Sequence, residues 1–219
     1  MAQIKHPGEG KPKPGGLQDW PSRVKQIRQQ AEQNLADGAV TPAYKANREQ
    51  IIDLLNRALT AEWTSFLQYW HHYTMASDLH SSEIADVWKE HAEEEYQHAQ
   101  RLNARINELG GVPANSPNEI AQLSPISFEK GHDLRNMLEA DLIAERQAIQ
   151  LYNDIVRTCG FDDNETRAIF EDVLLVENEH ANELASFLYQ YDASTGQQID
   201  TGHEAIIGQR PVPYRKAAS

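Results

Sequence analysis

The hydrophobic positions in the middle of the chain recur with the period of an α-helix. The clearest run contains Ile51, Leu54, Leu55, Ala58, Leu59 and Trp63. This 3.6-residue period continues without glycine or proline and predicts one long helix up to about Met75. Thr41-Pro42 is a typical helix start, because a capping residue precedes a proline. The first part of this stretch is also compatible with a separate short helix.

Three more long helices are expected after this one. They cover about residues 82–109, 132–158 and 163–189, and a glycine follows each of the first two. Residues 113–131 contain three prolines and show little periodicity, which predicts a long crossover loop with room for one short helical turn. Two short connections and one long crossover between the second and third helices predict an all-α four-helix bundle.

Polar segments flank this predicted bundle. Residues 5–16 are rich in Pro, Gly and Lys and predict a flexible arm, and a polar helix is expected from Trp20-Pro21 to near Gly38. The last residues are rich in Gly, Thr and Pro. We therefore expect an N-terminal extension over residues 1–45, the bundle over residues 46–190 and a C-terminal tail over residues 191–219.

The charge of the chain favours cations as ligands. The whole chain has a formal net charge of −13. Residues 1–45 carry a net +3 and residues 201–219 a net +2, so the part between them carries −18. Such an acidic body attracts cations and repels nucleic acid. No apolar run approaches the roughly 20 residues that span a bilayer, and the N-terminus lacks the apolar stretch of a signal peptide, so we expect a cytoplasmic protein. The single Cys159 excludes an intrachain disulfide.

The second and fourth predicted helices share the motif E-x-x-H-A. It occurs as Glu95 with His98 and again as Glu177 with His180. Residues three apart lie on one helical face, so a carboxylate and an imidazole at this spacing can bind one cation together. One such motif is weak evidence, because a solvated helix face also explains it. We prefer Glu95 to Glu94 because only Glu95 stands three residues before a histidine.

The first and third predicted helices share a second pattern. Ala-Glu at Glu62 is followed seven residues later by Tyr69, and Ala-Glu at Glu145 is followed seven residues later by Tyr152. Glu62 lies 33 residues before Glu95, and Glu145 lies 32 residues before the corresponding glutamate of the fourth helix. The bundle therefore looks like one helix pair used twice around a pseudo-twofold axis.

Both repeats together predict a buried site for two metal ions. Glu62 and Glu145 lie in otherwise apolar stretches, and a buried carboxylate is costly unless it is paired or binds a metal. Carboxylates and imidazoles suit iron or manganese better than Cu(I). The expected ligands are Glu62, Glu95, His98, Glu145, Glu177 and His180. His91, one turn before Glu95, is open to two interpretations: a residue that supports the site, or an ordinary exposed histidine.

At these residues the chain resembles the bacterioferritin and Dps-like branch of the ferritin superfamily. The resemblance covers about residues 47–189 and is carried by residues 59–73, 93–111, 141–145 and 177–184. It implies a ferritin-like bundle in which the same six residues are di-iron ferroxidase ligands. It further implies that Glu95 and Glu145 bridge the two ions. Tyr69 matches a tyrosine near such sites, either an electron donor or a core tyrosine.

Two departures narrow the resemblance. Haem-binding members have a methionine directly after the second-helix glutamate, where this chain has Tyr96, so we predict no haem. The C-terminal tail lacks an amphipathic fifth helix, which favours a 12-subunit shell over a 24-subunit shell. Typical Dps proteins place their iron site between subunits, whereas the six residues here come from one chain.

The resemblance implies iron storage and detoxification. Two Fe ions per subunit would be oxidised from Fe(II) to Fe(III) by O2 or H2O2, which limits oxidative stress, and the mineral would be kept in a homo-oligomeric shell. A manganese catalase-like site and a di-iron oxidase of an organic substrate stay open as alternatives. So does a DNA-protecting shell, in which an arm with Lys5, Lys11, Lys13, Arg23, Lys25 and Arg28 would bind phosphates.

Overall fold

The computed structural model describes residues 19–78 and 82–195. Seven helical elements occur in these ranges. They are α1 (Trp20–Ala31), η2 (Leu35–Asp37), α2 (Arg48–Asp78), α3 (Ser82–Glu108), α4 (Pro117–Leu123), α5 (Leu134–Cys159) and α6 (Asn164–Thr195). The described ranges contain no strand, so the all-α class is confirmed. None of these helices is long and apolar enough to cross a membrane.

The chain divides between Tyr44 and Lys45 into two compact units. In the first unit, Pro21 lies in the first turn of α1, as expected, and no residue of α1 or η2 is buried. The expected continuous helix to Gly38 is wrong. It is interrupted after α1 because Asn34 adopts a left-handed backbone with φ of 51°, and only the short η2 follows. The basic arm before residue 19 lies outside the described residues.

The second unit contains the bundle, and its first helix begins later than expected. Thr41 does not start a helix: its hydroxyl and carbonyl oxygens accept hydrogen bonds from the backbone of Ala43 (3.3 Å) and Tyr44 (2.9 Å), which closes a local turn. α2 begins at Arg48, after Asn47, whose side chain accepts a hydrogen bond from the Gln50 amide at 3.2 Å. Capping by Asn47 therefore fixes the start of α2.

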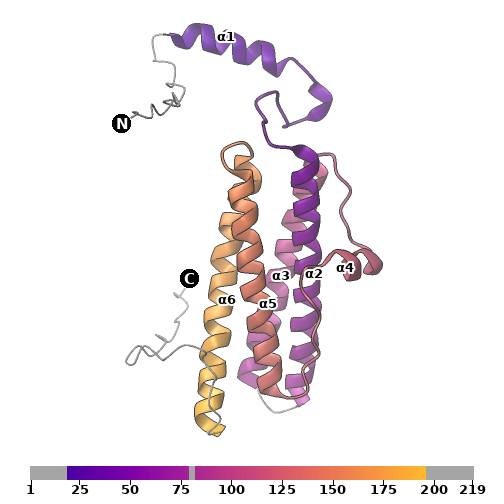
Figure 1. The fold of residues 1–219 in the computed structure, drawn as a ribbon, viewed down its shortest axis with the longest axis vertical. Coiled ribbons are helices and arrows are strands. Elements are labelled where there is room, and N and C mark those ends of the chain that lie inside the picture. The colour runs from indigo at the N-terminus through magenta and orange to yellow at the C-terminus, as the bar shows by residue number, and fades with distance from the viewer. Residues whose placement is uncertain (1–18, 79–81, 196–219) are drawn as a thin grey trace, which may run out of the picture. The chain divides into compact units, whose positions relative to one another are not determined.

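The four long helices lie side by side, with α2 packed along α3 and α5 packed along α6 (Figure 1). The crossover between the pairs runs along the bundle and contains the short α4, which Ser116 and Glu119 start with a capping box. α6 continues to Thr195, past the expected end at Tyr189, because buried Asp192 in its last turns accepts a hydrogen bond from Arg135 at 2.8 Å. The ferritin-like bundle with its long crossover is confirmed.

A buried polar network attaches the crossover to the bundle. Nδ1 of His72 lies 2.8 Å from Asp141, and its Nε2 lies 3.0 Å from the carbonyl oxygen of Glu129. Gln68 donates to Asp141 at 2.8 Å and accepts from the backbone amide of Glu129 at 2.7 Å. Because Asp141 lies one helical turn before Glu145, this network fixes the rotation of α5 beside the glutamate.

A second buried cluster joins α3 to the start of α6. The guanidinium of Arg105 lies 2.9 Å from Asp163 and 2.6 Å from Glu165, and it also donates to Thr166 at 2.9 Å. Asp163 also accepts a hydrogen bond from the Thr166 amide, so it caps α6. The cluster fixes the axial position of α6 against α3, which the E-x-x-H motifs on both helices require.

Candidate metal centre

The structure brings all six expected ligands together in the interior of the bundle. Each is at most 4% exposed, although they come from four different helices. Their side-chain donor atoms form two groups, in each of which the atoms lie within 4.8 Å of one another. One group contains Glu62, Glu95, His98 and Glu177, and the other contains Glu95, Glu145, Glu177 and His180.

Glu95 and Glu177 belong to both groups, so they lie between the two candidate metal positions. The resemblance assigns the bridging role to Glu95 and Glu145, whereas Glu145 belongs to only one of the two groups. The pseudo-twofold repeat explains the difference. Glu95 and Glu177 are counterparts in the repeat, so both lie beside the axis, whereas Glu145 and its counterpart Glu62 lie at opposite ends.

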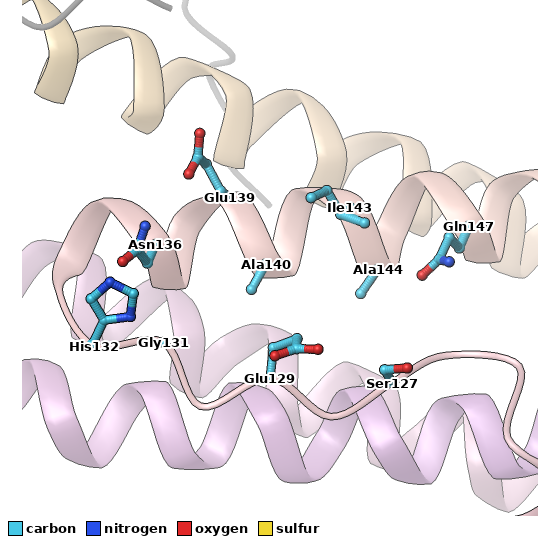
Figure 2. Close-up of a pocket in the computed structure, with 10 residues that line it drawn as sticks. All are labelled: Ser127, Glu129, Gly131, His132, Asn136, Glu139, Ala140, Ile143, Ala144 and Gln147. Atoms are coloured by element: carbon cyan, nitrogen blue, oxygen red, sulfur yellow. The ribbon is translucent and has the colours of Figure 1, made fainter.

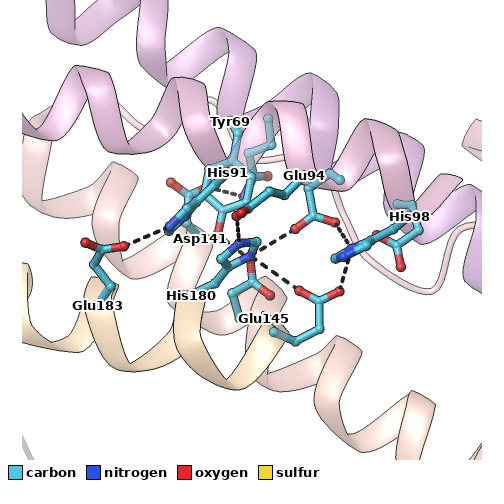
Figure 3. Close-up of polar contacts among 12 residues, drawn as sticks. Tyr69, His91, Glu94, His98, Asp141, Glu145, His180 and Glu183 are labelled. Carbon is cyan, nitrogen blue, oxygen red and sulfur yellow. Dashed lines mark hydrogen bonds and ion pairs between the residues drawn. The ribbon is translucent and has the colours of Figure 1, made fainter. Parts of the chain in front are cut away.

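Both histidines direct the same ring nitrogen at the carboxylates. Nδ1 of His98 lies 3.3 Å from Glu177 and 3.5 Å from Glu62. Nδ1 of His180 lies 3.2 Å from Glu95 and 3.4 Å from Glu145. Each histidine therefore belongs to one of the two donor groups. Figure 3 shows the two rings on either side of the carboxylates.

The centre contains a concentration of buried polar atoms without a hydrogen bond. They are Glu62 Oε2, Glu95 Oε1, His98 Nδ1, both carboxylate oxygens of Glu177, and His180 Nδ1. A buried polar group without a partner is costly. Divalent cations offer these atoms the partners that the protein lacks, and four carboxylates would neutralise two such ions. The donor set is therefore chemically suited to two divalent metal ions of intermediate hardness.

In the absence of a cation, bound protons offset the negative charges of the four clustered carboxylates. Burial, together with the charge of Glu177, raises the pKa of Glu145, and burial with Glu177 and Glu62 raises the pKa of Glu95 still further. Burial alone would lower the pKa of His98, but Glu177 and Glu62 hold it well above its usual value. Metal ligands must be deprotonated, so binding at this centre would release protons.

Two buried tyrosines cross the bundle to the terminal carboxylates. Tyr69 on α2 donates a short hydrogen bond to Glu145 on α5. Tyr152 on α5 donates to Glu62 on α2 at 2.5 Å. Burial and the neighbouring carboxylate raise the pKa of each hydroxyl well above its usual value, so both remain donors. Tyr152 was not expected to belong to the site, although its place in the Glu-Tyr repeat was a usable signal.

Two residues just outside the ligand groups hold His180. Glu94 accepts a hydrogen bond from Nε2 of His180 at 2.7 Å. His91 is buried, contrary to the exposed interpretation, and its ring stacks on His180 with 3.9 Å between centroids. The outer nitrogen of His91 lies 3.1 Å from Glu183 (Figure 3). Sequence reasoning assigned no role to Glu94 or Glu183, because their contacts join α3 to α6.

A partly polar cavity lies outside this centre. It has a volume of about 470 Å³ between the crossover and α5, and its lining includes Glu129, His132, Asn136 and Glu139 (Figure 2). None of the six expected ligands lines it. Tyr96, at the position of the haem methionine, is 48% exposed and packs against Trp63 with 5.9 Å between ring centroids. Its side chain offers no thioether sulfur.

Comparisons with known proteins agree on one family. A model described as a ferritin-like domain matches residues 52–193. The bacterioferritin of Rhodobacter capsulatus is 32% identical over 144 residues, covering 65% of this chain and 85% of that protein. Its structure, described as having a metal-free dinuclear site and haem iron, has a TM-score of 0.60 and 31% identity and covers 68% of this chain and 89% of its own.

Two other relatives extend this comparison. A nutrient stress-induced DNA-binding protein of a Synechococcus species is 31% identical over 142 residues, which cover 64% of this chain and 81% of that protein. A bacterioferritin-related protein of Bacteroides fragilis, described as a dodecameric thioferritin, has a TM-score of 0.66 and 29% identity. The match covers 71% of this chain and 94% of that protein.

Proposed function

Because this chain belongs to the ferritin-like domain family, we propose that it oxidises Fe(II) to Fe(III) at a di-iron centre within each subunit and stores the product in an oligomeric shell. The observation that carries the proposal is the pair of donor groups that share Glu95 and Glu177. These two carboxylates would each contact both ions. Glu62 with His98 would complete one position, and Glu145 with His180 would complete the other.

The residues contribute in three ways. The acidic middle of the chain attracts the cationic substrate. Ionised carboxylates then stabilise Fe(III) over Fe(II), because the more highly charged ion gains more from negative ligands. Protons held by Glu95, Glu145 and the two histidines leave when the ions bind. Two Fe(II) ions supply two electrons, which with two protons reduce one H2O2 to two waters or one O2 to one H2O2.

The tyrosines fit a supporting role in this chemistry. Tyr69 holds Glu145 in place through its hydroxyl and remains our candidate electron donor. Tyr152 holds Glu62 in the same way at the other end of the centre. The proposed oxidant is O2 or H2O2, and removal of peroxide together with Fe(II) would limit oxidative damage.

The shell is proposed from the relatives. The Bacteroides fragilis protein is described as dodecameric, and it has the higher TM-score of the two structures compared above. We therefore propose a 12-subunit shell. We also propose that the shell binds no haem, because Tyr96 cannot supply a thioether ligand. A cytoplasmic location stays a prediction from the sequence.

Aerobic addition of Fe(II) to the metal-free protein tests the proposal. Fe(III) formation and the consumption of O2 or peroxide would be followed beside size-exclusion chromatography. We expect rapid oxidation in a shell-sized particle, lost in Glu95→Gln but kept in Glu179→Gln, an exposed carboxylate on α6. A small oligomer that turns over peroxide only with Mn would favour the catalase-like alternative, and oxidation that survives Glu95→Gln would refute the proposed centre.

A further inference from the structure

The two halves of the metal centre are related by the repeat but have different surroundings. Aligning the two E-x-x-H motifs pairs Glu94 on α3 with Val176 on α6. The same alignment pairs His91 with Val173. Each polar residue beside His180 therefore has a valine as its counterpart beside His98. The repeat that sets the six ligands is broken at the residues that support them.

At the His180 end, the supporting contacts are direct. Glu94 accepts the hydrogen bond from Nε2 of His180 at 2.7 Å. The ring of His91 stacks on the ring of His180 with 3.9 Å between their centroids. With the carboxylate of Glu94 as acceptor, Nε2 keeps its proton, so Nδ1 is the nitrogen that would bind an ion after losing its own proton. Both contacts restrict rotation of the ring (Figure 3).

At the His98 end, the described residues supply no equivalent contact. All ion-pair contacts of His98 involve Nδ1, and within residues 19–78 and 82–195 no side chain makes a hydrogen bond to its Nε2. Val176 has no acceptor atom to offer. The tautomer and the orientation of His98 are therefore set without a carboxylate at its outer nitrogen.

We propose that Glu94 is a positioning residue that makes the two metal positions unequal, so that the position with His180 fills first and binds more tightly. A carboxylate that accepts the outer N–H of a ligating histidine fixes its tautomer and orientation and raises its basicity, and loss of such a partner typically costs about 10–100-fold in metal affinity. The negative charge of Glu94 acts in the same direction. This inference rests on the proposed function only in that the centre binds two divalent ions.

The repeat itself supplies the reciprocal experiment. Glu94→Gln keeps the size and an acceptor oxygen but removes the charge. Val176→Glu places a carboxylate at the counterpart position, where the side chain is also partly exposed, so the new group stays in reach of water. Glu179→Gln, which removes an exposed carboxylate of α6, is the matched control.

The measurement is anaerobic titration of the metal-free, full-length protein with Co(II), followed by calorimetry and by the visible absorption of the bound ion. We expect two steps in the unaltered protein, separated by about tenfold or more in affinity. Glu94→Gln should weaken the first step by about tenfold or more and bring the two together, Val176→Glu should strengthen the second step, and Glu179→Gln should change neither. His98→Ala should leave the tight step, whereas His180→Ala should remove it.

Each failure has a distinct meaning. Two steps of equal affinity in the unaltered protein, or a first step that Glu94→Gln leaves unchanged, would overturn the inference while the proposed function stands. A protein that binds no Co(II) at the centre would overturn the proposed function itself. If Val176→Glu fails to assemble, the Glu94→Gln titration alone decides, because that near-isosteric change at a one-third exposed side chain leaves the packing in place.

Discussion

Removal of the Tyr152 hydroxyl tests whether the crossed tyrosines stabilise the centre. Tyr152→Phe keeps the aromatic ring, which packs on Phe170 with 5.1 Å between centroids, and deletes only the donor to Glu62. Glu62 is 1% exposed, so its carboxylate lies away from the bulk water that could replace the lost donor. The substitution therefore isolates one hydrogen bond to a buried charged group.

The expected magnitude follows from this geometry. A hydrogen bond to a charged group contributes about 1.5–3 kcal/mol, and the acceptor left behind stays buried. For a chain of this size, that loss corresponds to a fall of roughly 3–12 °C in melting temperature. Since the same bond helps to hold the pKa of Glu62 below its usual value, its loss also raises that pKa.

Thermal and urea denaturation of the chelator-treated protein measure the effect. Tyr69→Phe, the counterpart in the repeat, should cost a similar amount because it deletes the donor to Glu145. Tyr189→Phe changes a 49% exposed tyrosine and should shift the transition little. If Tyr152→Phe were no more destabilising than Tyr189→Phe, the hydroxyl would not support Glu62 and the reasoning would fail.

Three further predictions concern stability, pH and metal. Arg105→Met should cost about 3–5 kcal/mol in denaturation experiments, because buried Asp163 loses its partner, whereas Arg101→Met at an exposed pair should cost under about 1 kcal/mol. The metal-free protein should lose stability as pH rises above about 4.5 because of Glu95, and further above about 6.5 because of His98, since their raised pKa values mean that the folded state keeps protons that the unfolded state releases; a flat melting-temperature profile would contradict this. Bound Co(II) should reverse the slope, and at a hundredfold excess over its dissociation constant each site should add about 2.7 kcal/mol; equal profiles with and without the ion would exclude binding to the folded state.

The sequence by itself determined the helices of the bundle and the residues that meet in it. Hydrophobic period, helix caps and glycine stops act within a few residues of the chain, so they can be recognised without a fold. The spacing of three residues places Glu95 beside His98 on one face of any helix. Its repetition 82 residues later, at Glu177 and His180, predicts the ligand set from the sequence alone.

The local sequence pattern predicted the wrong helix ends where contacts with distant residues determine them. Thr41-Pro42 has the composition of a helix start, yet α2 begins seven residues after Thr41, because a turn closes on Thr41 and Asn47 provides the cap. α6 runs past Tyr189 because Arg135 on a neighbouring helix holds Asp192. Such partners are distant along the chain, so no window of sequence contains both.

Only the tertiary structure decided which position each helix's side chains take in the centre. The rotation and axial offset of each helix pair placed Glu177, and not Glu145, in both donor groups with Glu95, and they directed Tyr69 at Glu145 and Tyr152 at Glu62. The same packing placed Glu94 at Nε2 of His180, whereas the contacts of His98 with carboxylates among the described residues all involve its Nδ1. Spacing along one helix fixes which residues share a face of that helix. Which faces of two different helices come into contact depends on the packing of all four helices.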